Sequence, residues 1–245
     1  MGGRGGRSHA ATAGGGALGA SWTQDARIKI KEFATKLGIT IDIHSLQRGN
    51  TRPDTVMSAL QDVREFYRKF PAAKGAVKEV VFYVRGGNAY AGMDTRGTLH
   101  LRQYGTMSIE KLKSQYNLDL SAKFHPQNTD YHAIIWHEIG HALESHIARK
   151  ENGRASFGPI AVDVLERAAK KTLGLSPADS VSVDDIRGLA KTISGYAVSN
   201  KDTYGNYNWQ VWETVAEAVG DYAQNGSKAN KYSVAIAQEV LNRLK

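Results

Sequence analysis

The chain has 245 residues with 41% hydrophobic content, a formal net charge of +8 and no cysteine. No segment approaches the roughly 18 consecutive apolar residues of a membrane span, and the N-terminus lacks the apolar stretch of a secretory signal, so we expect a soluble protein without membrane contacts. Without cysteine there are no disulfides or thiolate ligands, which leaves histidine and carboxylate side chains to hold any metal ion.

The positive net charge would attract polyanions. The 32 lysines and arginines are scattered through predicted helices, and the sequence contains no C2H2 finger or other nucleic-acid motif. We therefore favour a solvated cationic surface. Binding to nucleic acid is retained only as a third possible function, which a salt-dependent binding test would separate from the others.

Residues 1–20 contain eight glycines, two arginines and few side chains that can pack. This composition predicts a flexible leader. The apolar pattern becomes regular after it, and we predict a single domain over residues 21–245.

The first part of this domain predicts a helix, a strand and a second helix. The apolar spacing from Trp22 to Leu37 is typical of an amphipathic helix, and the alternation over residues 39–43 predicts a strand. The second amphipathic helix is predicted over residues 54–70, and Pro71 closes it.

The main β region follows this second helix. Val, Phe and Tyr are frequent over residues 77–85, and two further strand patterns cover residues 89–93 and 98–102. Turn residues at 86–88 and 94–97 separate the three runs. Because short turns join neighbouring antiparallel strands, we predict a small, mostly antiparallel sheet.

Helical patterns dominate the remainder of the chain. A short helix is predicted over residues 108–116, and a long one runs from Thr129 or Asp130 to about Lys150. Three or four more helices are predicted, over about residues 160–173, 182–198, 208–225 and 228–244. Since the strands come first and the helices afterwards, we predict an α+β fold with the long helix at the junction.

The long helix contains the motif H-E-x-x-H, as His137, Glu138 and His141. The two histidines lie one turn apart on the same face, so their imidazoles can hold one metal ion while Glu138 faces water bound to that ion. The motif also occurs by chance. Here the helix is apolar nearly all round, which predicts burial, and buried histidines and glutamates are unfavourable unless they bind a partner. We therefore predict a metal site.

A catalytic zinc site needs a third protein ligand. The longer motif H-E-x-x-H-x-x-G-x-x-H is excluded, because Glu144 and Ile147 stand where it requires glycine and histidine. In the predicted helix 208–225, Glu213 and Glu217 lie together opposite the apolar face, beside small residues that permit close helix packing. Glu213 would complete a site of two histidines and one glutamate, and Glu217 would accept the free ring N–H of one histidine. The alternative is a pair of surface glutamates.

Three other titratable residues belong to the same long helix. Glu144 lies on the side of both ligand histidines and is a candidate to orient one of them, with an ion pair or simple exposure as the alternative. His132 and His146 point to the other side, so we expect packing or surface roles for them.

Three segments together resemble a known family. They are residues 137–141 (HEIGH), 193–197 (ISGYA) and 213–218 (ETVAEA). Over about residues 75–225 the chain resembles the gluzincin metallopeptidases related to the anthrax lethal factor catalytic domain, and the peptidase domains assigned to phage minor head proteins. The resemblance implies a zincin-like fold, zinc bound by His137, His141 and Glu213, and a tyrosine, Tyr196, that assists catalysis.

The chain departs from the family pattern in two places. The loop over residues 199–208, between the tyrosine and the glutamate helix, is longer, polar and rich in Tyr and Asn. Thr214 and Val215 follow Glu213, where aromatic residues are usual in the family. Both departures leave the H-E-x-x-H motif intact.

These features predict a zinc-dependent endopeptidase. Zinc lowers the pKa of its bound water towards about 7 and polarises the scissile carbonyl, Glu138 takes up the proton, and Tyr196 donates to the developing oxyanion or the leaving amine. The substrate is expected to be a protein or peptide, which can bind as an added strand along residues 89–102.

The alternative is a phage or virion-associated structural protein that keeps the zincin fold, with a mainly structural metal and with phage head components as partners. The intact Glu138 argues against this alternative, because a purely structural site has no need of a general base. In either case we expect a cytoplasmic or virion-associated protein.

Overall fold

The computed structural model describes residues 21–82, 89–198 and 209–245. The predicted leader over residues 1–20, the turn at 86–88 and the polar loop over 199–208 lie outside the described residues. The helices and strands are α1 (Gln24–Leu37), β1 (Thr40–Ile41), α2 (Ile43–Arg48), α3 (Pro53–Lys69), η1 (Pro71–Ala73), β2 (Glu79–Phe82), β3 (Ala91–Met93), β4 (Thr98–Leu101), α4 (Gln103–Thr106), α5 (Ile109–Ser121), α6 (Ala133–Asn152), α7 (Pro159–Leu173), α8 (Val183–Ile193), η2 (Tyr196–Val198), α9 (Val211–Asn225), η3 (Gly226–Lys228) and α10 (Lys231–Arg243).

The four described strands form one mixed sheet in the order β1-β2-β4-β3. β2 pairs in parallel with both β1 and β4, and only the β3/β4 pair is antiparallel. The fold is α+β as predicted, but the prediction of a mostly antiparallel sheet is wrong. Turn residues indicate where a chain reverses, whereas the choice of partner strand depends on contacts between residues far apart in the sequence.

One predicted hairpin forms and another does not. β3 and β4 pair in antiparallel fashion, and the turn between them is closed by Asp94, whose side chain accepts hydrogen bonds from two amides of the turn at 2.9 Å and 3.0 Å. Gly97 in this turn has a φ of 89°, which glycine adopts without strain. The expected hairpin between the first two strand patterns is wrong for the described residues, because β2 pairs with β1 and β4 inside the sheet and β3 pairs with β4 at its edge.

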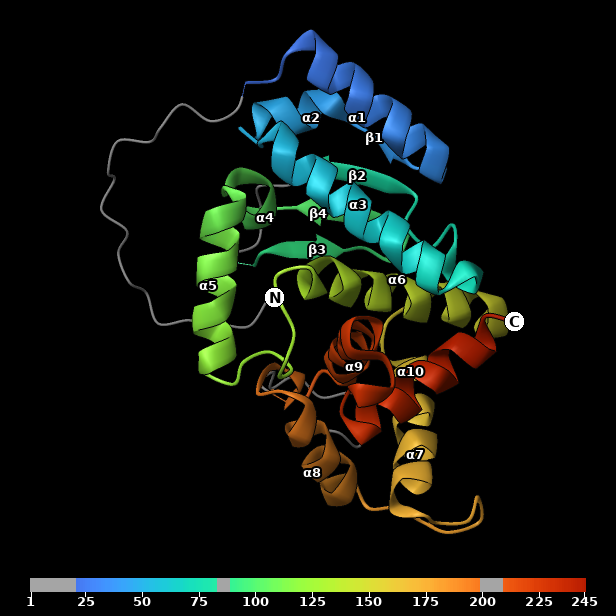
Figure 1. Ribbon diagram of the computed structural model, residues 1–245. Coiled ribbons are helices and arrows are strands. Elements are labelled where there is room, and N and C mark those ends of the chain that lie inside the picture. The colour runs from blue at the N-terminus through green and yellow to red at the C-terminus, as the bar shows by residue number, and fades with distance from the viewer. Residues whose placement is uncertain (1–20, 83–88, 199–208) are drawn as a thin grey trace.

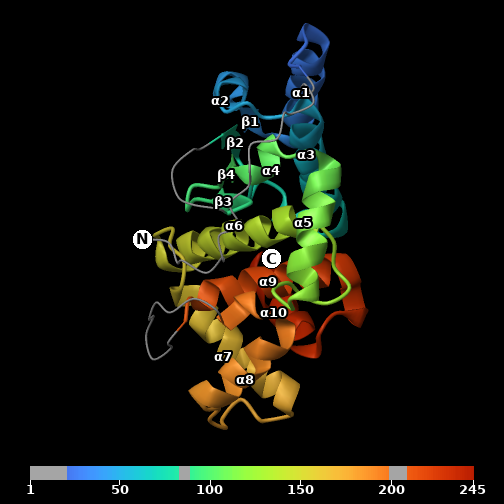
Figure 2. The same ribbon diagram turned by 90° about the vertical axis from the view of Figure 1, so that its left-hand side faces the viewer.

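The predicted strand over residues 39–43 is shortened by an unpredicted helix. The Asp42 side chain accepts a hydrogen bond from the Ser45 amide at 2.9 Å, and this cap starts α2 directly after β1. α3 then lies across one face of the sheet (Figures 1 and 2). Leu60 and Val63 of α3 and Leu99 of β4 are fully buried, as the amphipathic pattern of α3 requires.

α6 lies between the sheet half and the helical half of the molecule (Figure 1), which confirms the predicted place of the long helix. On one side it runs beside the edge strand β3, and the Ser145 hydroxyl donates to the Thr95 carbonyl in the β3/β4 turn at 2.8 Å. On its other side lie α9 and α10, with α7 and α8 beyond them (Figures 1 and 2). Gly153, with a φ of 70°, ends α6 where the sequence predicts an end.

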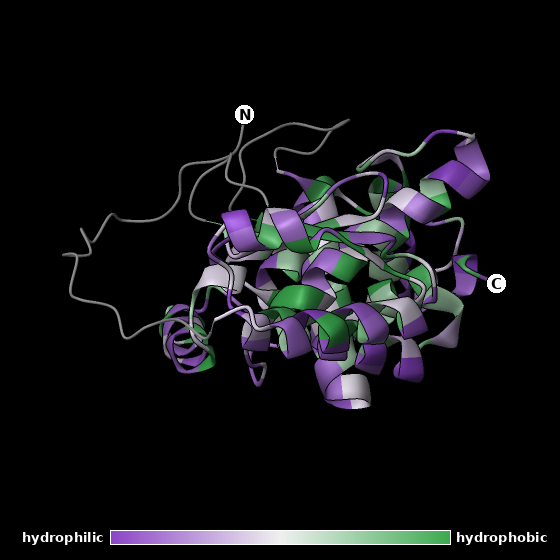
Figure 3. Ribbon diagram, turned by 90° about the horizontal axis from the view of Figure 1, so that it is seen from above, coloured by the Kyte–Doolittle hydropathy of each residue, from purple (hydrophilic) through white to green (hydrophobic). Residues whose placement is uncertain are grey.

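A continuous set of buried hydrophobic side chains runs through both halves. Along α6, every residue from Ala133 to Ala148 except His146 is buried, in agreement with its apolar pattern. Seen from above, hydrophobic segments gather in the middle of the molecule and hydrophilic segments at its periphery (Figure 3). Within the described ranges, no helix combines the length and the apolar character needed to cross a membrane.

Candidate metal centre

Helices α6 and α9 approach each other closely at small residues. A Cβ atom added to Gly140 would lie only 2.8 Å from the Cα of Ala216, and one added to Gly220 would lie 3.5 Å from the His137 amide nitrogen. The expected role of the small residues of α9 is confirmed, whereas the packing role of Gly140, inside the motif, was not predicted. Because the helices are so close, Glu213 of α9 reaches the histidines of α6.

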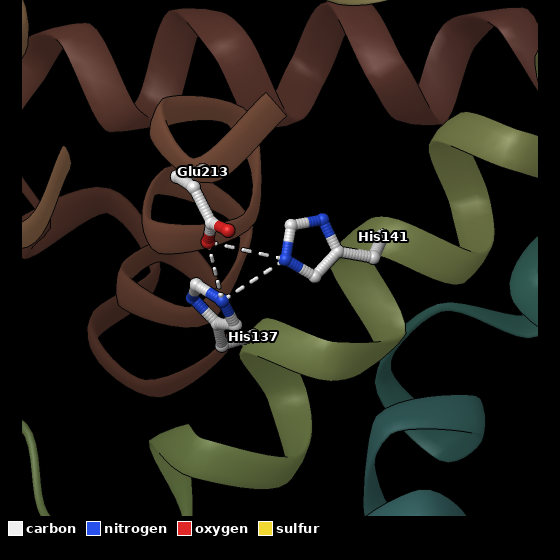
Figure 4. Close-up of side chains that lie close together, drawn as sticks. All are labelled: His137, His141 and Glu213. Atoms are coloured by element: carbon white, nitrogen blue, oxygen red, sulfur yellow. Dashed lines mark hydrogen bonds and ion pairs between the residues drawn. The ribbon is translucent and has the colours of Figure 1, made fainter. Parts of the chain in front are cut away.

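Three side-chain atoms from these two helices converge (Figure 4). His137 Nε2 and His141 Nε2 lie 3.1 Å apart, and Glu213 Oε2 lies 3.2 Å and 3.3 Å from them. Two tetrahedral ligands with zinc bonds of about 2.0–2.1 Å are about 3.3 Å apart, so these atoms match one face of such a tetrahedron. Among the described residues they are the only group of three or more His, Asp or Glu side chains that could hold a metal ion.

Glu217 fixes the orientation of the His137 ring. Its Oε1 lies 2.8 Å from Nδ1, so in the neutral ring Nδ1 carries the proton and Nε2 presents its lone pair to the other two ligand atoms. Burial disfavours the charged ring, yet the carboxylates of Glu213 and Glu217 outweigh burial and hold the pKa of His137 well above its ordinary value. A bound cation would compete with that proton, because a metal ligand must be the neutral imidazole.

Glu138 is buried and the Glu213 side chain is 12% exposed, and their pKa values move in opposite directions. Burial raises the pKa of Glu213, but the two histidines outweigh burial and hold it well below the ordinary range. Burial raises the pKa of Glu138, whose Oε2 has no hydrogen-bond partner within the described part of the chain. Two imidazoles, one ionised carboxylate and a neighbouring unsatisfied carboxylate oxygen fit a divalent cation, which would offset the buried negative charge.

Tyr196 lies beside the converging ligands. Its ring centroid is 5.7 Å from that of His137 and 4.9 Å from that of Phe124. Two backbone hydrogen bonds join its segment to the loop before α6: the Gly195 amide donates to the Lys123 carbonyl at 2.8 Å, and the Tyr196 amide donates to the Phe124 carbonyl at 3.1 Å. The structure thus brings Tyr196 to the centre, although the two lie far apart in the sequence.

Glu144 has a different environment from the one expected. It is fully buried, and its Oε1 accepts a hydrogen bond of 2.6 Å from the Gly158 amide, which opens α7. Burial raises the pKa of Glu144 to about 7. The predicted contact with a ligand histidine is absent from the described hydrogen bonds, and solvent exposure is excluded. The sequence could not show this contact, because it depends on how the chain folds back after α6.

Three neighbours of the centre were given no role from the sequence. Ser194 donates from Oγ to Glu217 Oε2 at 2.8 Å, Phe124 packs against Tyr196, and the ring of Phe157 lies 5.5 Å from that of His141. Ser194 belongs to the segment that carries the family resemblance, which was a usable signal. Phe124 and Phe157 lie outside helices and strands, where no periodic pattern indicates which side chains are buried.

No family model matches this chain, and neither a curated protein nor a solved structure matches it.

Proposed function

We propose that the chain is a zinc-dependent endopeptidase of the gluzincin type. The observation that carries the proposal is the convergence of His137 Nε2, His141 Nε2 and Glu213 Oε2 at 3.1 to 3.3 Å. Beside them lies the buried Glu138, whose Oε2 has no hydrogen-bond partner among the described residues. A structural metal site has all its positions filled by protein ligands, whereas three ligands leave one position open for catalysis.

The nature of the donors favours zinc. Imidazole nitrogen and carboxylate oxygen suit zinc, and the edge lengths match a tetrahedral arrangement. Two histidines and a carboxylate also hold iron(II) in oxygenases, with ligands in an octahedral arrangement. The position of Glu138 next to the ligands favours hydrolysis, because water activation requires a base at that place.

Each side chain around the centre then has a role in hydrolysis. Bound zinc would supply Lewis acidity, which lowers the pKa of coordinated water towards about 7 and polarises the scissile carbonyl. Glu138 accepts the proton of the attacking water and returns it to the leaving amine, and burial, which raises its pKa, suits this exchange. Tyr196 donates a hydrogen bond to the developing oxyanion or the leaving amine.

The edge strand β3 suits an extended substrate. Among the described strands β3 pairs only with β4, and its other edge lies towards α6 (Figure 1). A peptide can add to such an edge as a further strand, with its main chain bound by hydrogen bonds and its side chains alternating between the two faces. The proposed substrate is therefore a protein or peptide in an extended conformation.

The second candidate is a virion-associated structural protein with a zincin fold. Its partners would be phage head components, and its metal would stabilise the packing of α6 on α9. Glu138 argues against this candidate. A buried carboxylate oxygen without a partner among the described residues lowers stability, and a structural metal site does not need it.

Replacement of the base tests the proposal. Glu138→Gln keeps shape and ligands, so zinc content and melting temperature are expected to stay near wild type while hydrolysis of a peptide library falls by orders of magnitude. Glu32→Gln, on the exposed face of α1, is the matched control and should change none of the three. If zinc-loaded wild type cleaves nothing in broad library and self-processing assays, the structural candidate replaces the enzyme.

A further inference from the structure

Ser194 contacts two parts of the centre through one hydroxyl. It is 4% exposed, and its Oγ donates to Glu217 Oε2 at 2.8 Å while accepting a hydrogen bond from the Ala197 amide at 3.0 Å. Glu217 uses its other oxygen to hold His137 Nδ1 at 2.8 Å. A chain of hydrogen bonds therefore runs from the backbone beside Tyr196, through Ser194 and Glu217, to a proposed metal ligand.

The backbone around Tyr196 is fixed from two further directions. The Ala197 carbonyl accepts a hydrogen bond from the Thr214 hydroxyl of α9 at 2.7 Å, and Thr214 in turn accepts one from Trp209 Nε1 at 2.9 Å. On the opposite side, the amides of Gly195 and Tyr196 donate to carbonyls of the loop before α6. A Cβ added to Gly195 would lie 3.0 Å from the Lys123 carbonyl oxygen, so this segment has little freedom to shift.

We propose that Ser194 is a positioning residue that couples the orientation of His137 to the placement of Tyr196. The inference rests on the proposed function and deepens it. Glu217 is buried, so each of its oxygens needs a hydrogen-bond donor. His137 Nδ1 lies at Oε1, and the Ser194 hydroxyl donates to Oε2. The same hydroxyl holds the Ala197 amide, which fixes the turn that carries the Tyr196 ring against His137. Loss of the hydroxyl should therefore disturb both ends of this chain of hydrogen bonds.

A merely structural role for Ser194 predicts a different outcome. Ser194 directly follows α8, and the alternative role of its hydroxyl is to end that helix. In that case removal of the hydroxyl lowers stability, and any effect on zinc affinity or turnover adds to the effects of the Glu217 and Tyr196 substitutions. Non-additivity between substitutions separates the two roles, because residues that act through one another share a loss instead of summing it.

The first arm of the test needs no enzymatic activity. Zinc affinity is measured by chelator competition for Ser194→Ala, Glu217→Ala and the double variant. We expect Ser194→Ala to weaken zinc binding about 3- to 10-fold in the wild-type background and less than about 2-fold when Glu217 is already alanine. Equal losses in both backgrounds overturn the coupling to His137. This arm remains decisive even if no peptide is cleaved and the proposed function fails.

The second arm follows the Tyr196 end of the chain. Removal of the hydroxyl frees the Ala197 amide, so hydrogen exchange at residue 197 of the zinc-loaded protein should rise at least about tenfold in Ser194→Ala. In peptide hydrolysis, Ser194→Ala should lower kcat about tenfold or more with KM within about twofold, and it should add little to Tyr196→Phe. Unchanged exchange, or losses that add fully with Tyr196→Phe, overturn the coupling to Tyr196.

Two control variants complete the design. Ser194→Thr retains the hydroxyl, and the extended backbone there (φ −161°, ψ 164°) suits a β-branched residue, so both readouts should return towards wild type. Ser233→Ala removes another buried hydroxyl, which belongs to α10 and has no hydrogen-bond partner among the described residues. It should leave zinc affinity and exchange at residue 197 unchanged. If Ser233→Ala matches Ser194→Ala, or the threonine variant does not recover, the effect is a general one of core packing and the proposal is wrong.

Discussion

Two histidines, one at the N-terminal cap of α6 and one within α6, each face a carboxylate through Nδ1, yet the two pairs have different roles. His132 Nδ1 lies 2.6 Å from Asp62 Oδ1 of α3, and His137 Nδ1 lies 2.8 Å from Glu217 Oε1 of α9. Around His137, the Nε2 side meets two further ligand atoms from His141 and Glu213. Around His132, the described residues supply no such group.

The His132–Asp62 pair is a structural link between α3 and the start of α6. The other oxygen of Asp62 accepts a hydrogen bond from the Tyr104 hydroxyl at 3.2 Å, and the Asp62 carbonyl accepts one from Trp136 Nε1 at 3.0 Å. The His132 side chain is 35% exposed, whereas that of His137 is 11% exposed. A histidine held by a carboxylate is therefore not yet a metal ligand; convergence of further donors in a buried place makes it one.

The largest expected effect is the loss of metal from one pair and not from the other. His137→Ala combined with His141→Ala removes both imidazoles, so tight zinc binding should disappear. His132→Ala should retain one zinc per chain, although it unties α3 from α6. Metal analysis after dialysis against a weak chelator measures both, and stoichiometric zinc in the double variant would mean that the ion binds elsewhere.

The next effect separates the two glutamates of α9. Glu213→Ala leaves two protein ligands and should abolish tight binding, while Glu217→Ala removes only the group that orients His137 and should lower affinity or rate about 10- to 100-fold. Asp62→Asn is the matched change at the other histidine and should leave zinc affinity within about twofold. Competition with a chromophoric chelator ranks the three. If Glu217→Ala loses the metal and Glu213→Ala keeps it, the two roles must be exchanged.

A third effect concerns the close contact between α6 and α9 at Gly140 and Ala216, which brings Glu213 to His137. Gly140→Ala places a Cβ against Ala216, so the helices must separate, and the free energy of unfolding should fall by about 1–3 kcal/mol with weaker zinc binding. Gly188→Ala is the control, because no atom lies within 4 Å of an added Cβ in α8. It should instead stabilise by about 0.4–1 kcal/mol. Denaturant titrations compare them, and a neutral Gly140→Ala would show that the contact is looser than described.

The smallest effect is a pH dependence confined to the structural pair. Burial lowers the pKa of His132, but the hydrogen bond and charge of Asp62 outweigh it and raise the pKa above the usual value. A raised pKa in the folded state gives stability that is fully present below the usual histidine pKa of about 6.5 and is lost as pH rises through the raised value.

Wild type should therefore exceed His132→Gln in unfolding free energy by more at about pH 6 than at about pH 9. The difference is expected to be less than about 1 kcal/mol, because the ring is partly exposed. Chemical denaturation at the two pH values measures it. A difference that grows with pH would contradict the charged pair.

Features that follow from local sequence patterns could be predicted, whereas contacts between distant segments could not. The faces of α6 and α9 follow from helical periodicity, a local property, so the positions of His137, His141, Glu213 and Glu217 could be predicted. The partner of Glu144 and the contact of Ser194 with Glu217 depend on chain segments that fold back from a distance.

The prediction of a mostly antiparallel sheet failed for the same reason as the prediction for Glu144. β1 and β4 both pair with β2 in parallel, across long connections whose course leaves no short-range pattern in the sequence. The β3/β4 hairpin, closed by a local turn, was predicted correctly. His132 was expected to have a packing or surface role, but its partner, Asp62, could not be identified, because α3 and α6 are far apart in the chain.

X-ray absorption at the zinc edge of the zinc-loaded protein tests the central claim most directly. The three converging side chains predict one zinc per chain in a four-coordinate shell of nitrogen and oxygen at about 2.0–2.1 Å, with scattering from two imidazoles and none from sulfur. His132→Ala should leave this spectrum unchanged. A shell with fewer than two imidazoles, or a six-coordinate shell of oxygen, would contradict the account.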